Sequence, residues 1–106
     1  MDALFEWDEN KRLKNIEKHG IDFADAVKVF EGFVHTYRDT RADYGEVRNV
    51  TIGLLNGLEV TVIHTARENA TRIISVRRAR REERRLYYEE AEKYGYRLRE
   101  TKSNER

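Results

Sequence analysis

The sequence of 106 residues contains neither cysteine nor proline. The lack of cysteine excludes disulfides, thiol catalysis and cysteine-ligated metals, and it agrees with a reducing compartment. No stretch approaches the roughly 20 apolar residues that a membrane-spanning helix needs. Residues 1–7 also lack the order of basic, apolar and small residues found in signal peptides. We therefore expect a cytoplasmic protein that makes no contact with a membrane.

Charge is unevenly distributed along the chain, although the formal net charge is only +1 at pH 7. Hydrophobic and charged residues each make up 39% of the sequence, so apolar runs at residues 50–55 and 60–63 can form a core beneath a charged surface. Between residues 72 and 85 there are seven arginines, Arg72, Arg77, Arg78, Arg80, Arg81, Arg84 and Arg85, against Glu82 and Glu83. This local excess indicates nucleic acid as a partner.

The first third of the chain carries the signals of a short strand and two helices. Residues 4–7 alternate briefly, Asp8 can cap a helix over residues 9–19, and Gly20 can end it in the left-handed conformation. Asp22 can cap a second helix, whose apolar stripe follows helical spacing and should face the core. The stripe consists of Phe23, Ala26, Val27 and Phe30.

Beyond Gly32 the apolar periodicity changes from helical spacing to alternation, which indicates strands. Asn56-Gly57 lies between two alternating segments and predicts a tight antiparallel hairpin. Strands gathered between helices favour an α+β fold, in one domain over residues 1–95 with a flexible polar tail over residues 96–106. The expected elements are strands at residues 34–38, 50–55, 59–65 and 71–77, a charged loop at 39–46 and a helix from about 79 to 95.

The strand at residues 71–77 is the first candidate for binding a phosphodiester. Alternation places Ser75 and Arg77 on one face, with Ile74 and Val76 on the other. The arginine fork suits phosphate because it donates hydrogen bonds in pairs and keeps its charge at any working pH. The alternative is a solvated basic edge without a ligand.

The following helix adds a second candidate group. Arg80, Glu83 and Tyr87 fall at spacings of three and four, which places them on one helix face. Spacing alone favours a structural role, in which they form ordinary helix pairs and Tyr87 packs on the sheet.

Histidine is the side chain suited to proton transfer near neutral pH. His19 lies at the end of the first expected helix, where it can act in catalysis or cap the helix terminus. His64 shares a face with apolar neighbours and is expected in the core, and His35 is given no role. The histidines do not have metal-ligand spacing, and phosphate loops and serine elbows are absent. After these exclusions, recognition or cleavage of a phosphodiester remains as the candidate function.

Two blocks of residues resemble the BrnT toxin family over about residues 5–90. The resemblance departs from the family's pattern at Val76, where alanine is common, and in a tyrosine-rich extension after Glu90. The matching positions are residues 5–11, Asn15, residues 18–23, Ala26 and Phe30 in the first block, and Ile52, Gly53, residues 64–67, residues 72–77, Ala79, Glu83, Arg84 and Tyr87 in the second.

This resemblance implies a RelE-like fold, in which two N-terminal helices pack on a curved antiparallel sheet that a C-terminal helix follows. It also implies a ribonuclease that arrests translation and is neutralised by a BrnA-like antitoxin, with two copies of each protein in the complex. Operator DNA would then be contacted only through the antitoxin. The family's motif positions in this chain are His19, Arg67, Arg77, Glu83, Arg84 and Tyr87.

Our hypothesis is cleavage of RNA, free or bound to the ribosome, without metal or cofactor. Arg77 and Arg84 would stabilise the charge on the phosphate, and Glu83 or His19 would transfer protons. The alternative function is an inactive RNA-binding or antitoxin-binding module. We predict His19, Arg77, Glu83 and Arg84 as catalytic residues, and Arg67, Arg72, Arg80 and Tyr87 as RNA-binding residues.

Overall fold

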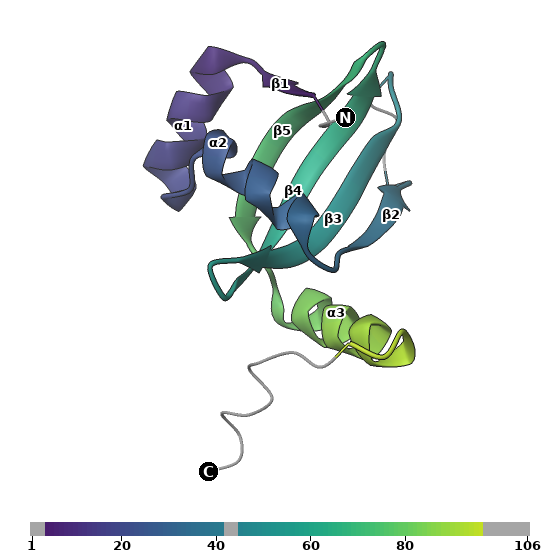
Figure 1. Cartoon of the computed structure of the whole chain (residues 1–106). Helices are drawn as coiled ribbons and strands as arrows, with labels where there is room; N and C mark the ends of the chain where they lie inside the picture. The colour runs from purple at the N-terminus through teal and green to yellow at the C-terminus, as the bar shows by residue number, and fades with distance from the viewer. Residues whose placement is uncertain (1–3, 42–44, 97–106) are drawn as a thin grey trace.

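A computed structural model describes residues 4–41 and 45–96 of the chain, and Figure 1 shows their arrangement. The fold is α+β, as predicted, with one five-stranded sheet in the order β1-β5-β4-β3-β2. The elements are β1 (Phe5–Trp7), α1 (Glu9–His19), α2 (Phe23–Ala26), the 3₁₀ helix η1 (Val27–Glu31), β2 (His35–Asp39), β3 (Arg48–Leu55), β4 (Leu58–Arg67), β5 (Ala70–Arg78) and α3 (Arg81–Lys93).

The sheet is mixed, whereas an antiparallel sheet was expected. Strands β2 to β5 form an antiparallel meander, but β1 pairs in parallel with β5. The reason lies in the connection, because α1, α2 and η1 carry the chain from β1 at one edge across one face of the sheet to β2 at the other edge (Figure 1).

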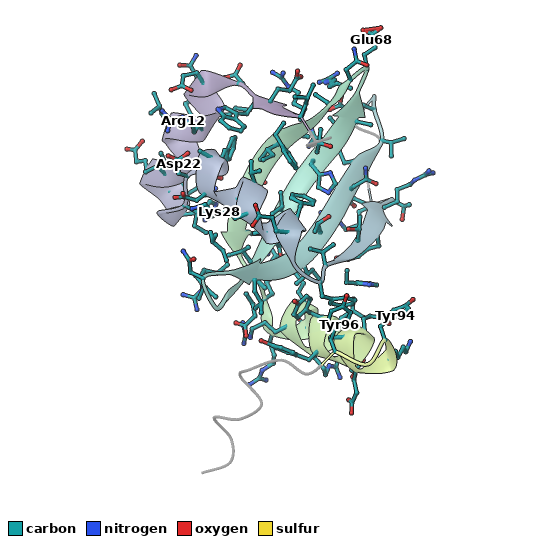
Figure 2. The ribbon with its side chains drawn as sticks, viewed as in Figure 1. Arg12, Asp22, Lys28, Glu68, Tyr94 and Tyr96 are labelled. Atoms are coloured by element: carbon teal, nitrogen blue, oxygen red, sulfur yellow. The ribbon has the colours of Figure 1, made fainter. Side chains whose placement is uncertain are left out.

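Local signals determine the first helix as expected. The Asp8 carboxylate accepts a hydrogen bond from the backbone NH of Lys11 at 3.1 Å, and Gly20 ends α1 with a φ of 74°. Asp22 caps α2 through the NH of Ala24. The Arg12 guanidinium donates to Asp22 at 3.0 Å, so α1 and the start of α2 are tied together (Figure 2).

The second helix differs from the prediction. It is α-helical only over Phe23–Ala26 and continues as a 3₁₀ helix. A 3₁₀ helix has three residues per turn, and the fully buried side chains are accordingly Phe23, Ala26 and Val29, at intervals of three. Val27 and Phe30, which an unbroken α-helix would have placed in the core, are only partly buried.

The predicted hairpin at Asn56 and Gly57 is confirmed. Both residues have positive φ values, 52° and 84°, as a tight turn between two right-twisted strands requires. Gly53 is also constrained, since a Cβ there would lie 2.5 Å from a side-chain carbon of Val29. The sheet therefore meets η1 closely at this point.

A register shift between Ile63 and His64 changes which residues of β5 face the core. Ile63 pairs with Ser75 and His64 with Ile73, so Ile74 has no partner across the ladder. The core residues from β5 are consequently Ile73 and Val76. The expectation that Ile74 shares the core-facing side of the strand with Val76 was wrong, because strict alternation does not continue through a bulge.

Helix α3 packs on the other face of the sheet from α1 and α2. Ile52 of β3 contacts Tyr87 and Ala79 in a second core cluster, whereas Val60 and Val62 belong to the cluster beneath α2 and η1. After α3, the ring of Tyr96 lies 4.6 Å from that of Phe33. The rest of the predicted tail lies outside the described residues. Within these residues, no helix is long and apolar enough to cross a membrane.

Candidate active site

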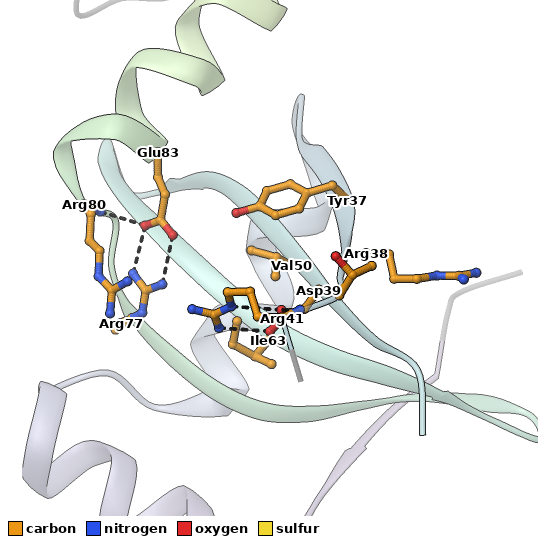
Figure 3. A pocket seen from close by; sticks show the side chains of 10 residues that line it. Tyr37, Arg38, Asp39, Arg41, Val50, Ile63, Arg77, Arg80 and Glu83 are labelled. Carbon is orange, nitrogen blue, oxygen red and sulfur yellow. Dashed lines mark hydrogen bonds and ion pairs between the residues drawn. The ribbon is translucent and has the colours of Figure 1, made fainter. Parts of the chain in front are cut away.

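A cleft of about 320 Å³ opens between the start of α3 and the end of β2 (Figure 3). This volume falls at the lower end of the range typical of small-ligand sites. Its lining combines arginines with carboxylates and one tyrosine. The lining residues are Tyr37, Arg38, Asp39, Thr40 and Arg41 from the end of β2, Val50 and Ile63 from β3 and β4, and Arg77, Arg80 and Glu83 from β5 and α3.

The centre of the cleft is a two-pronged ion pair between Arg77 and Glu83. The two guanidinium NH₂ groups of Arg77 donate to the two carboxylate oxygens at 2.8 and 2.9 Å. The Arg77 and Glu83 side chains are only 21% and 13% exposed. The Thr61 hydroxyl also donates to Glu83 at 2.9 Å, and the backbone NH of Arg80 at 2.7 Å. Four hydrogen bonds thus fix the carboxylate, and the carboxylate fixes Arg77.

Secondary structure accounts for this arrangement. Arg77 and Thr61 are cross-strand partners in β5 and β4, so their side chains share the sheet face that α3 covers. Glu83 lies in the first turn of α3, where its carboxylate accepts from the helix-capping residue Arg80. A carboxylate is favoured there because the first turn has unpaired backbone NH groups.

Burial and hydrogen bonding act on Glu83 in opposite directions. Burial alone raises its pKa, but the hydrogen bonds from Arg77, the Arg80 backbone and Thr61 outweigh burial and lower the pKa from 4.5 to about 2. The carboxylate therefore stays ionised at neutral pH and is a weak proton acceptor. Its geometry and its pKa both favour the positioning of Arg77 over proton transfer.

His19 approaches this site from the other side of β5. The Asn15 side chain of α1 accepts from the backbone NH of Val76 at 3.2 Å and donates to its carbonyl at 3.0 Å. It thereby replaces a strand partner at the edge of β5, next to Arg77. His19 is half-buried, and burial together with the charges of Lys18 and Arg77 lowers its pKa. The imidazole is therefore mainly neutral at pH 7, although His19 does not line the cleft itself.

The family model described as "Ribonuclease toxin, BrnT, of type II toxin-antitoxin system" matches residues 7–83. The chain belongs to the BrnT family. Its fold is similar to the crystal structure of the Brucella abortus ribonuclease toxin BrnT, with a TM-score of 0.60 and 38% sequence identity. The match covers 76% of this chain and 100% of the Brucella chain. No curated protein sequence matches.

Within this BrnT fold, three of the other predicted site residues have different surroundings. Arg80 lines the cleft. Arg84 instead donates to the backbone carbonyl of Ala79 at 2.8 Å, so it closes the turn before α3 and does not line the cleft. Tyr87 is 1% exposed and its hydroxyl donates to the Phe33 carbonyl at 2.9 Å. A base cannot stack on an enclosed ring, so Tyr87 has the packing role that was the alternative for it.

Arg67 and Arg72 lie at the opposite end of the sheet from Arg77. Along β4 the partner of Arg77 is Thr61, six residues before Arg67, which corresponds to roughly 20 Å at a rise of about 3.3 Å per residue. Arg67 pairs with Glu46 at 3.3 Å, and Arg72 pairs with Glu6 at 2.9 Å. The structure therefore does not bring these two arginines to the cleft of the BrnT chain.

Sequence reasoning missed the β2 side of the cleft. Tyr37 and Arg41 were left in a short strand and a charged loop, with no sign of what they would face. The Asp39 side chain is almost completely buried and binds the Arg41 guanidinium through both oxygens, each at 3.0 Å. Alternating arginine and acidic residues after Tyr37 were the one available signal, but spacing cannot show that β2 ends opposite α3.

His64 has the buried position that the sequence predicted. It is 8% exposed, its Nε2 lies 2.7 Å from the Thr51 hydroxyl oxygen, and burial lowers its pKa. The edge of its ring packs on Phe30. Among the residues that the structure describes, no three His, Asp or Glu side chains gather where they could hold a metal ion.

Proposed function

We propose that this BrnT-family chain is an active endoribonuclease that cleaves RNA without a metal ion, at the cleft between α3 and β2. The observation that carries the proposal is Arg77, held by a buried two-pronged pair with Glu83 beside further arginines. A pre-positioned guanidinium is suited to a phosphate that gains negative charge during reaction.

In the mechanism that we infer, the ribose 2′-hydroxyl oxygen attacks the adjacent phosphorus and the bond to the 5′-oxygen breaks. Arg77 and Arg80 stabilise the additional charge on the phosphate oxygens. We assign the proton of the 2′-hydroxyl to neutral His19, which lies outside the cleft lining but is close enough to Arg77 for that charge to lower its pKa. The lowered pKa leaves the imidazole unprotonated at pH 7. The leaving 5′-oxygen takes a proton from water. The products are a 2′,3′-cyclic phosphate end and a 5′-hydroxyl end.

Glu83 has a positioning role in this scheme. Each of its carboxylate oxygens is bound by Arg77, and its pKa of about 2 makes it a poor base. This refines the earlier hypothesis, in which either Glu83 or His19 transferred the proton. It also replaces Arg84 with Arg80 as the second charge-stabilising group, because Arg80 lines the cleft.

The proposal extends to the cellular setting. Cleavage of RNA, free or on the ribosome, would inhibit translation in the cytoplasm, and a BrnA-like antitoxin would neutralise the chain. Such an antitoxin would also be the component that contacts operator DNA. Co-expression of the pair and measurement of its mass in solution tests the expected assembly of two toxins with two antitoxins.

The decisive experiment incubates the purified protein with total RNA in EDTA and analyses the ends of the fragments. We expect fragments with 2′,3′-cyclic phosphate ends. In His19→Gln we expect the cleavage rate to fall by about 100-fold or by a larger factor. His35→Gln is the matched control, since His35 lies on β2 in a separate hollow beside Tyr94 and Tyr96, whereas the charge of Arg77 acts on His19. Circular dichroism checks that both variants fold.

Intact RNA in EDTA, and also when ribosomes are added in a magnesium buffer that keeps them assembled, would contradict the proposal. Salt-dependent binding of intact RNA would then indicate a binding-only protein. Cleavage of ribosome-free RNA that appears only after a divalent metal is added would contradict the metal-independent mechanism.

A further inference from the structure

Tyr37 faces the Arg77–Glu83 pair from the opposite wall of the cleft. In Figure 3 its ring lies above Val50, with the hydroxyl directed toward Glu83. Val50 is the cross-strand partner of Tyr37 in β3, so the ring rests on a neighbouring strand. It is 38% exposed. The ring is therefore supported on one side and accessible on another.

No other aromatic side chain is found among the described residues that line the cleft. The exposed tyrosines Tyr94 and Tyr96 lie at the end of α3 (Figure 2). Their rings are near that of Phe33, and they do not line the cleft. The cleft thus pairs a cationic wall at Arg77 with an aromatic wall at Tyr37. A nucleotide has the matching division, with a charged phosphate at one end and a flat base at the other.

The local electrostatics agree with a neutral ring. Burial and the nearby Glu83 carboxylate raise the pKa of the Tyr37 phenol, although Arg77 and Arg41 act in the opposite direction. The phenol therefore carries no charge at physiological pH and does not repel a phosphodiester. Base-to-aromatic stacking needs only the face of the ring, which every base can use.

We propose that Tyr37 stacks on the nucleobase beside the phosphate that Arg77 binds, and thereby positions the RNA in the cleft. This inference rests on the proposed function, since it assumes that RNA occupies the cleft. It adds a specificity-determining residue on β2 to a cleft whose proposed phosphate-binding residues, Arg77 and Arg80, lie on β5 and just before α3. Different bases stack with different strength, so the ring biases which nucleotide lies next to the cleaved bond.

A thermodynamic cycle on binding tests the stacking directly. The probe is a fluorescein-labelled 2′-fluoro hexanucleotide that contains all four bases and lacks the 2′-hydroxyl nucleophile. Fluorescence anisotropy gives its dissociation constant for the wild type, Tyr37→Leu and Tyr37→Phe. Tyr94→Leu is the matched control, because Tyr94 is also exposed but lies outside the cleft.

We expect Tyr37→Leu to weaken binding about 5-fold to 100-fold, the effect of losing one base-to-aromatic contact. Tyr37→Phe and Tyr94→Leu should stay within about twofold of the wild type, since both retain the ring in the cleft. Replacing one particular nucleotide of the probe by an abasic unit should remove the difference between wild type and Tyr37→Leu. Abasic units elsewhere should leave that difference in place.

Three results would overturn the role of Tyr37. These are an equal loss in Tyr37→Phe, a difference that no single abasic unit removes, and unchanged binding in Tyr37→Leu. The probe cannot be cleaved, so the outcome is separate from that of the ribonuclease assay. If Tyr37 stacks but the protein leaves RNA intact, only the proposed function is contradicted. If RNA is cleaved but Tyr37→Leu binds the probe as tightly as the wild type, only the stacking role of Tyr37 is contradicted. No measurable binding by the wild type would contradict both.

Discussion

Two arginine–carboxylate pairs anchored on β5 differ in their surroundings. Arg72 and Glu6 join the neighbouring strands β5 and β1 at 2.9 Å, with side chains that are 31% and 41% exposed. Arg77 and Glu83 join β5 to α3, are largely buried, and have additional hydrogen bonds from Thr61 and Arg80. Exposed pairs contribute little to stability, whereas breaking a buried pair leaves a charge without compensation. Similar sequence chemistry therefore gives a surface contact at one end of the strand and a pre-organised site at the other.

Removal of each arginine should separate the two pairs most clearly. We expect Arg77→Ala to lower the RNA cleavage rate about 100-fold to 1,000-fold, because one positioned charge-stabilising donor is lost. The cleavage rate of Arg72→Ala should stay within about twofold of the wild type, since Arg72 lies away from the cleft and its ion pair with Glu6 is exposed. Initial rates on one RNA substrate provide the measurement.

A loss of fold in Arg77→Ala is controlled by a second variant. Arg77→Lys keeps the positive charge but cannot donate to both carboxylate oxygens in the arginine geometry, so it should fold and still lose rate. Equal rates for the variants at Arg77 and Arg72 would show that the buried pair has no part in catalysis.

The pH dependence of stability should distinguish the two carboxylates. The pKa of Glu83 is lower in the folded chain, about 2, than its ordinary value of 4.5. Its stabilising contribution is therefore complete above about pH 4.5 and is lost as pH falls toward 2. After allowance for solvent screening we expect Glu83→Gln to cost roughly 1 to 2 kcal/mol at pH 7, and Glu6→Gln less than about 0.5 kcal/mol.

Urea unfolding at pH 7, 4 and 3 measures this difference. The wild type and Glu83→Gln should converge as pH decreases, because protonation removes the charge that the variant lacks. A gap that is constant with pH would show that the lost stability comes from packing or from neutral hydrogen bonds, and not from the ionised carboxylate.

Local elements of the fold and the candidate site differ in how far the sequence could predict them. Elements determined by neighbouring residues were predicted well, as at Asp8 and Gly20 for α1, and at Asn56 and Gly57 for the hairpin. These signals act within a few residues, since they depend on backbone conformation and on unpaired NH groups.

Features that depend on distant contacts were not predictable in this way. The packing of Val29 in place of Phe30 follows from a 3₁₀ segment, and the burial of Ile73 in place of Ile74 follows from a bulge. The facing of Tyr37 and Arg77 depends on the order of the strands. Sequence spacing could place Glu83 on a helix face but could not show that this face meets Arg77.

The salt dependence of RNA binding should show the smallest of the expected differences between the two ends of the sheet. Each phosphate contact with a single strand contributes about 0.7 to the slope of log affinity against log salt. Arg80 lines the cleft, whereas Arg67 pairs with Glu46 at the far end of the sheet. We therefore expect Arg80→Ala to reduce the slope by about 0.7 and Arg67→Ala to leave it unchanged. The uncleavable hexanucleotide serves as the probe, between roughly 50 and 200 mM salt, where such slopes are informative. An equal reduction of the slope in both variants would mean that RNA continues along the sheet past the cleft. An arginine with a carboxylate partner could then exchange that partner for a phosphate.

In that case the exposed pairs would extend the binding surface, and the contrast between the two ends would apply to catalysis alone.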